Sequence, residues 1–282
     1  MSYEVGIIGS GTMGLSIAQL LATNMAANSV TLITKKHKID TIKFTIEFFI
    51  KKLIKKGKLD ASFTERFETR FTFSSEYESL KINNLIIEAI SEDIQKKKLL
   101  LNEISEYTND QAIIASNTSS LSITELSTAY KLPNKVIGIH FFNPATIMEL
   151  NEIIVGFTTD KDTLNQSLDF SKKLGKEPVL VNESPGFIVN RMLIPMINEA
   201  ISILAEGVAS AEDIDKAMKL GAHHPMGPLT LADFIGNDVN LSIMETLFKE
   251  TGDPKYRPHA LLRKMVRANF LGRKTKQGFF KY

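Results

Sequence analysis

A histidine and a glutamate in the middle of the chain have the types and spacing needed for proton transfer. His140 stands in the segment His140-Phe141-Phe142-Asn143-Pro144, and Glu152 follows twelve positions later in the apolar run 150–154. An unpaired carboxylate would be costly in such a strand, so a histidine is its natural partner. Imidazole titrates near neutral pH, and a carboxylate at one ring nitrogen would fix its tautomer. The pair is therefore a candidate general base, although a buried histidine can also be purely structural.

Polar residues also follow another predicted strand. Ser116-Asn117-Thr118-Ser119-Ser120 comes directly after the apolar run 112–115, and His140 ends the next strand along the chain. The carboxyl ends of parallel strands form the ligand-binding edge of an open α/β sheet. A serine or asparagine at such a position is more often a cap or turn residue, so the position alone assigns no role.

The beginning of the chain has the turn expected for a bound dinucleotide. The apolar run 5–8 leads into Gly9-Ser10-Gly11-Thr12-Met13-Gly14 and then a helical pattern. Gly9 permits a tight turn, Gly11 lets the backbone approach a pyrophosphate, and Gly14 lets the helix pack closely. The helix N-terminus would hold the phosphates. A dinucleotide beside a histidine base is suited to oxidising a secondary alcohol, because the base takes the hydroxyl proton as hydride leaves.

Alternating strand and helix patterns position these groups as far as residue 182. The strand candidates are 5–9, 30–33, 85–88, 112–115, 136–140 and 149–155. This alternation predicts an α/β domain over residues 1–182, with a mostly parallel sheet and helices on both faces. One of its helices begins at Asp40 and ends at Gly57, with a lysine-dense last turn.

Strand patterns nearly vanish after residue 182. Helical patterns follow at 187–206, 238–249 and 259–268, and Ser210 with Asp213 forms a capped helix start. Residues 183–282 are therefore predicted to form a smaller, all-helical domain.

Composition limits the possible partners. The 282 residues are 43% hydrophobic and 23% charged, with a net charge of +2, which favours neither a nucleic acid nor a membrane surface. The absence of cysteine removes disulfides and thiolate metal sites and fits a reducing compartment, and we expect no metal site. The first strand follows the first residues too closely for a secretory leader, so a cytoplasmic protein is the simplest interpretation.

A series of motifs follows the order of a known family. They are Gly9-Ser10-Gly11-Thr12-Met13-Gly14, Glu88-Ala89-Ile90, Ser116-Asn117-Thr118-Ser119-Ser120, His140-Phe141-Phe142-Asn143-Pro144, Pro185-Gly186-Phe187-Ile188-Val189-Asn190-Arg191, Pro225-Met226-Gly227-Pro228 and Gly278-Phe279-Phe280. With these the chain resembles the 3-hydroxyacyl-CoA dehydrogenase family over nearly its whole length. The resemblance implies a Rossmann-type doubly wound domain, a helical substrate-binding and dimerisation domain, an acyl-CoA substrate of short chain length, and a homodimer.

The resemblance also implies a role for each matching residue. His140 would be the general base, Glu152 its orienting partner, and Ser119 and Asn190 would hydrogen-bond the reacting oxygens of the substrate. Asn143 would complete this polar pocket, which would lie in a cleft between the two domains. Lys56 matches a position that contacts coenzyme A. The implied cofactor-binding residues are Gly9, Gly11, Thr12, Met13, Gly14, Thr34, Lys35, Glu88, Lys97, Asn117 and Asn143.

Three departures from the family pattern affect these expectations. The family's aspartate after the second strand is replaced by Thr34-Lys35-Lys36, which would attract rather than repel a 2′-phosphate. NADP(H) is therefore slightly favoured over NAD(H), although an exposed basic loop could also accompany NAD(H). Phe49 replaces a serine in the coenzyme A region. Lys276 replaces a glycine in the family's Lys-Thr-Gly-x-Gly-Phe motif.

Two other functions remain open at this point. The same fold could oxidise a small free hydroxy acid, and such an enzyme would not need Lys56 or the basic helix. The chain could also be a binding or structural relative without turnover. The set of polar residues Ser119, His140, Asn143, Glu152 and Asn190 argues against a non-catalytic role, because packing alone gives no reason to keep it.

Overall fold

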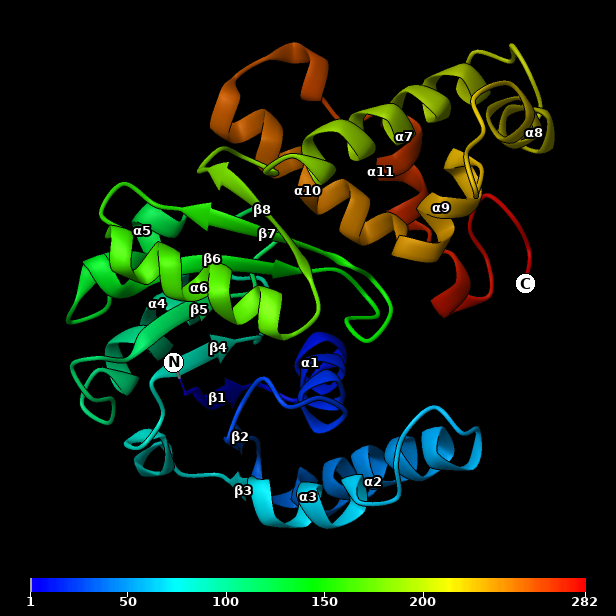
Figure 1. The fold of residues 1–282 in the computed structure, drawn as a ribbon. Helices are drawn as coiled ribbons and strands as arrows, with labels where there is room; N and C mark the ends of the chain where they lie inside the picture. Colours follow the sequence, from blue (N-terminus) through cyan, green and yellow to red (C-terminus); the bar gives the residue numbers. More distant parts are fainter. Residues whose placement is uncertain (1) are drawn as a thin grey trace. The chain divides into compact units, whose positions relative to one another are not determined.

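The computed structural model describes residues 2–282, which fall into two compact units (Figure 1). The first unit extends to Glu183 and the second begins at Ser184. In the sequence, the predicted strand patterns end at residue 182, one residue before this boundary. Each unit has its own cluster of buried hydrophobic residues.

The first unit is built on an eight-stranded sheet. The strands are β1 (Glu4–Ile8), β2 (Ser29–Ile33), β3 (Phe71–Ser74), β4 (Leu85–Glu88), β5 (Ile113–Ser116), β6 (Val136–Phe141), β7 (Leu150–Val155) and β8 (Glu177–Asn182). Their order is β3-β2-β1-β4-β5-β6-β7-β8, which Figure 1 shows from bottom to top. All neighbours are parallel except β6 and β7. The first six positions follow the order of a doubly wound dinucleotide-binding sheet, so the expected Rossmann-type fold is confirmed.

Two strands of this sheet were not among the sequence candidates, and both are edge strands. β3 has four residues, of which two are polar, and β8 contains Pro178 and exposes most of its side chains. An edge strand needs hydrogen-bonding partners on one side only and tolerates proline. Short or exposed strands of this kind lack the apolar pattern on which the sequence prediction relied.

Helices cover both faces of the sheet. In this unit they are α1 (Thr12–Ala22), α2 (Ile39–Lys55), α3 (Phe63–Arg70), α4 (Ile94–Ile104), α5 (Ile123–Ser127) and α6 (Lys161–Lys173). Ile87 and Ile137 point into a core shared with α1, α2 and α6. Alternate residues point to the other face, where a Cβ at Gly138 would lie 3.0 Å from Ile123 of α5. The central run Ile113–Ala115 is fully buried because both faces are covered.

The second unit is helical, as expected. Its helices are α7 (Val189–Ala205), α8 (Ala211–Gly221), α9 (Pro228–Ile235), α10 (Asn237–Thr251) and α11 (Ala260–Arg267). α7 begins two residues later than predicted because Gly186 and Phe187 have left-handed φ values of 71° and 52°. Ser210 caps α8 as predicted, by accepting a hydrogen bond from the backbone N–H of Asp213. α9 was not predicted, and its first residue is Pro228, in a position that suits proline.

One buried carboxylate fixes the C-terminal segment of this unit. Asp233 is 1% exposed and accepts hydrogen bonds from the backbone N–H groups of Phe279 and Phe280, each at 2.9 Å. A Cβ at Gly278 would lie 1.9 Å from the Asp233 carboxylate. Glycine is therefore required at position 278 for steric reasons, and the next two residues are held by their backbone hydrogen bonds to Asp233.

Lys276 stands in the left-handed region, with a φ of 59°, where the family pattern has glycine. A side chain with a Cβ is strained in that region by roughly 1 kcal/mol. We expect Lys276→Gly to raise the free energy of unfolding by about 0.5–1 kcal/mol, measured by urea denaturation. Lys249→Gly is the control: it lies within α10 and should lower that free energy by about 1 kcal/mol. A similar decrease in the free energy of unfolding in both variants would show that Lys276 is not strained.

Candidate active site

The glycine turn lies between β1 and α1, beside the point where the strand order reverses. Gly9 has a φ of 109°, and a Cβ there would lie 2.5 Å from the carbonyl oxygen of Ala89. A Cβ at Gly14 would lie 2.1 Å from the carbonyl oxygen of Gly9. A Cβ at Gly11, in contrast, would meet nothing within 4 Å. Gly9 and Gly14 are thus required by the chain itself, whereas Gly11 leaves open space at the helix N-terminus, which fits a dinucleotide pyrophosphate.

Thr34 extends this turn toward β2. Its side chain is buried, and its hydroxyl oxygen lies 2.5 Å from that of Ser10 in the glycine turn. Lys35 and Lys36 follow it and are exposed, as is Thr12 at the start of α1. Where the family carries an aspartate, this chain therefore has a hydroxyl bonded to the turn, followed by exposed cations.

His140 and Glu152 are direct cross-strand neighbours in the antiparallel pair β6–β7. The distance between His140 Nδ1 and Glu152 Oε2 is 2.7 Å, and both side chains are buried. The ring of Phe142 packs 4.4 Å from the imidazole ring, measured between centroids. The contact expected from the sequence is present, and it leaves Nε2 as the ring nitrogen directed away from Glu152. A buried base held in one tautomer by a carboxylate is equipped for proton transfer.

The ends of β4, β5 and β6 are tied together by side chains. Asn117 accepts a hydrogen bond from the backbone N–H of Phe141 at 2.9 Å, so it fixes the strand end next to His140. Both carboxylate oxygens of Glu88 accept bonds from the ammonium of Lys97, at 2.7 and 2.8 Å. The Ser116 hydroxyl donates to the same carboxylate at 2.6 Å. Glu88 and Lys97 have no exposed surface, so their assignment to the cofactor site remains a prediction.

Glu92 was not among the predicted site residues, yet it holds the turn that carries Ser119. Its Oε1 accepts hydrogen bonds from the hydroxyl of Thr118 at 2.6 Å and from the backbone N–H groups of Ser119 and Ser120 at 2.8 and 3.2 Å. Its other oxygen lies 3.5 Å from Lys97 Nζ. In the sequence, Glu92 could be recognised only as an acidic residue a few positions after β4. The N–H groups that it binds follow β5, the neighbouring strand.

The next residue, Asp93, explains the position of Glu92. Asp93 caps α4 by accepting hydrogen bonds from the backbone N–H groups of Gln95 and Lys96, at 3.0 and 3.1 Å. The Lys96 bond is the main cause that holds the pKa of Asp93 below its usual value. The cap fixes where α4 begins, and therefore where Glu92 and Lys97 stand.

Other predicted residues lie at the surface or in the second unit. Asn143 is exposed in the loop after β6, and Lys56 is exposed at the end of α2. Asn190 is the second residue of α7, in the second unit, and its role remains a prediction. Within residues 2–282, no group of three or more His, Asp or Glu side chains could hold a metal ion. No helix in the same range is long and apolar enough to cross a membrane.

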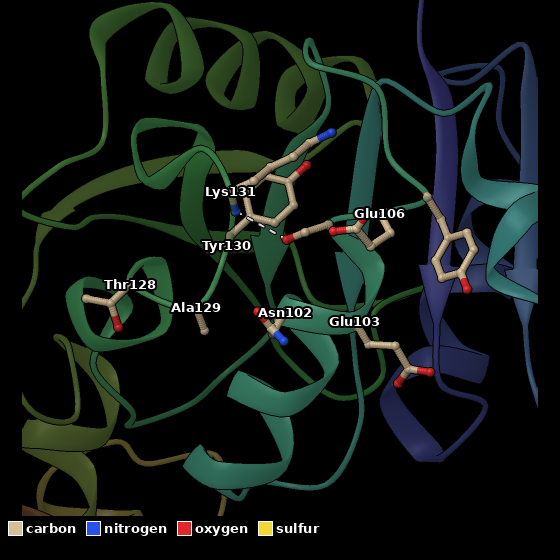
Figure 2. Close-up of a pocket in the computed structure, with 9 residues that line it drawn as sticks. Asn102, Glu103, Glu106, Thr128, Ala129, Tyr130 and Lys131 are labelled. Carbon is tan, nitrogen blue, oxygen red and sulfur yellow. Dashed lines mark hydrogen bonds between the residues drawn. The ribbon is translucent and has the colours of Figure 1, made fainter.

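A pocket of about 470 Å³ lies elsewhere in the first unit (Figure 2). Residues near the ends of α4 and α5 form its wall, and Lys131 donates its backbone N–H to Ser105 there. Each of these helix ends leads into the amino end of the next parallel strand. The pocket is therefore on the side opposite to His140, and none of the predicted site residues lines it.

Comparisons with known proteins point to the same family for both units. Residues 4–184 match the family model "3-hydroxyacyl-CoA dehydrogenase, NAD binding domain", and residues 186–282 match "3-hydroxyacyl-CoA dehydrogenase, C-terminal domain". The chain is 50% identical over 280 residues to 3-hydroxybutyryl-CoA dehydrogenase of Clostridioides difficile, with 99% of each chain covered. It is similar to the crystal structure of (S)-3-hydroxybutyryl-CoA dehydrogenase from Ralstonia eutropha, with a TM-score of 0.95, 44% identity, and 100% and 99% of the two chains covered.

The open space at Gly11 gives a test of dinucleotide binding. Gly11 has a φ of −69°, which alanine adopts without strain, so Gly11→Ala should leave the urea unfolding midpoint unchanged. The added methyl group should weaken binding of the reduced dinucleotide at least about tenfold, equivalent to roughly 1.4 kcal/mol, as measured by fluorescence titration. Gly14→Ala is the contrast, because its Cβ would strike the backbone and should destabilise the fold. Unchanged affinity in Gly11→Ala would place the dinucleotide elsewhere.

Proposed function

Because the chain belongs to the 3-hydroxyacyl-CoA dehydrogenase family, we propose that it interconverts short-chain L-3-hydroxyacyl-CoA and 3-ketoacyl-CoA. The proposed substrate pair is 3-hydroxybutyryl-CoA and acetoacetyl-CoA, and the names of the similar proteins support this chain length. The observation that carries the proposal is the 2.7 Å contact between His140 and Glu152 at the ligand-binding edge of the sheet.

The two residues divide the acid–base work. The nicotinamide, when bound, accepts hydride from or returns it to C3 of the substrate. In the oxidation direction His140 takes the proton of the C3 hydroxyl at Nε2, and in reduction it gives that proton back. Glu152 holds Nδ1 and stabilises the imidazolium that forms. Ser119, on the turn held by Glu92, is proposed to hydrogen-bond the reacting oxygen, and Asn143 to complete the polar pocket.

The charge distribution supports a substrate that carries coenzyme A. Residues 35–58 contain nine lysines and two acidic residues, a net charge of +7, whereas the whole chain carries only +2. The remainder of the chain is therefore acidic, at −5. Most of these lysines lie on or beside α2, and Lys56 at its end is exposed. A concentrated basic surface attracts polyanions such as the phosphorylated adenosine of coenzyme A. A small free hydroxy acid would not require it.

We also propose that NADP(H) is preferred over NAD(H). The buried Thr34 offers no negative charge to repel a 2′-phosphate, and Lys35 and Lys36 are exposed beside it. The match to an NAD-binding family domain supports a nicotinamide cofactor of either kind. A homodimer and a cytoplasmic location remain predictions.

The catalytic proposal predicts rapid oxidation of reduced nicotinamide in the presence of acetoacetyl-CoA, followed by absorbance. His140→Gln should lower kcat by roughly 10²- to 10⁴-fold through loss of the general base. Glu152→Gln should also lower kcat, because the imidazole would be misoriented and less basic. His223→Gln is the matched control, since His223 is exposed in the second unit. Near-normal turnover in His140→Gln would contradict the assignment.

Two results would favour the other functions. Turnover of a small free hydroxy acid that is insensitive to Lys56→Gln would indicate the second class of dehydrogenase. Absence of turnover with every acyl chain length and both nicotinamides would indicate a role without catalysis.

Cofactor choice is tested by comparing kcat/KM for NADPH and NADH. We expect the ratio to exceed one in the natural chain and to fall below one in Thr34→Asp, because a carboxylate repels the 2′-phosphate and accepts hydrogen bonds from an unmodified ribose. Thr41→Asp adds the same charge at an exposed position in α2 and should leave the ratio unchanged. A natural preference for NADH would make the lysine loop incidental.

A further inference from the structure

A buried lysine holds the loop that follows His140. This loop, residues 142–149, connects β6 to β7 and carries Asn143. The ammonium of Lys176 donates hydrogen bonds to the carbonyl oxygens of Ala145 at 2.6 Å and Met148 at 2.7 Å. Lys176 is only 6% exposed although lysine is among the least buried residue types.

The backbone on both sides of Lys176 is fixed, so its side chain has a defined direction. Gly175 follows the C-cap of α6 with a φ of 75°, and the N–H of Lys176 donates to the carbonyl of Ser171 at 3.0 Å. The next residue, Glu177, begins β8 and donates its N–H to the carbonyl of Glu149 at 2.9 Å. The lysine is therefore anchored between a helix end and a strand start.

A second anchor holds the same loop from the dinucleotide side. The hydroxyl oxygen of Ser16, in α1, accepts a hydrogen bond from the backbone N–H of Ala145 at 2.8 Å, and both groups are buried. Ala145 is thus held through its N–H by α1 and through its carbonyl by Lys176. These contacts connect the loop to the helix that begins at the glycine turn and leave little freedom to the segment between His140 and Ala145.

The buried ammonium is unfavourable in itself. Burial lowers the pKa of Lys176, and the carboxylate of Glu149 opposes that change. A nonpolar side chain of the same length could fill the space without this cost, but it would leave two inward-facing carbonyl oxygens without their donor. The ammonium therefore acts on the loop backbone and not only on packing.

We propose that Lys176 is a positioning residue for turnover: by clamping the loop 142–149 it keeps Asn143 and His140 in the geometry that the reaction needs. This inference rests on the proposed dehydrogenase function. Because the clamp touches neither the glycine turn nor Thr34, and Asn143 is only one of the predicted cofactor contacts, it affects kcat more than the KM for the dinucleotide.

The absence of cysteine from the chain permits a sharp test. Lys176→Cys introduces one thiol, which is alkylated in urea before refolding. Bromoethylamine restores an ammonium at the length of lysine, whereas bromopropane gives a neutral side chain of the same length. Lys172→Cys, exposed near the end of α6, receives both treatments as the control, and the natural chain is taken through the same refolding.

We expect the propyl form at position 176 to have a kcat at least about tenfold below that of the aminoethyl form, because small displacements of reacting groups are costly. The KM for the dinucleotide should differ between the two forms by less than kcat does. Both forms at position 172 should match the natural chain. Equal kcat values for the two forms at position 176 would overturn the inference, whereas a natural chain that does not reduce acetoacetyl-CoA would instead contradict the proposed function.

Ser16→Ala provides an independent measurement if the propyl form does not refold. It removes the other anchor of the loop, so kcat should fall several-fold. In the double variant of Ser16→Ala with Lys176→Cys, kcat should fall by less than the product of the two single decreases. An unchanged kcat in Ser16→Ala, or fully independent losses in the double variant, would contradict a shared role in holding the loop.

Discussion

Two opposite charges are buried together where β4 ends, and the arrangement of the candidate site depends on them. Lys97 and Glu88 have no exposed surface and lie 2.7–2.8 Å apart. The Ser116 hydroxyl and the N–H of Ile90 donate to the same carboxylate. Loss of one partner would leave a buried charge uncompensated, at a cost of roughly 3–5 kcal/mol. The pair therefore fixes α4, β4 and β5 relative to one another.

From this pair a sequence of contacts extends along the carboxyl edge of the sheet. The fixed start of α4 places Glu92 against the turn that carries Ser119, and Asn117 joins the end of β5 to the end of β6. His140 and Glu152 then meet across β6 and β7. Each polar group is positioned by a hydrogen bond from a neighbouring element, which is how a site keeps its geometry before a ligand arrives.

The charges proposed to attract coenzyme A are arranged differently from the charges that hold the fold. The lysines of residues 35–58 are exposed and outnumber the acidic residues of the same segment. They therefore create a positive electrostatic potential at the surface rather than a fixed contact with one partner. Lys97 and Lys176, in contrast, are buried and bonded to named oxygen atoms. Residue type alone does not distinguish these two uses of lysine, because burial and partners come from the fold.

The sequence by itself determined the features that depend on local pattern. The strand, turn and helix around Gly9 and Gly14, the apolar central strands and the helical second unit were predicted correctly. The contact between His140 and Glu152 was also predicted, because an apolar strand requires a partner for its carboxylate. Only the tertiary structure showed the edge strands β3 and β8. It also showed the hydrogen bonds from the Ser119 turn to Glu92 and those from Lys176 to the loop 142–149. Periodicity reports which face of an element is buried, whereas the partner of a given hydrogen-bonding group depends on which distant segments the folded chain brings together.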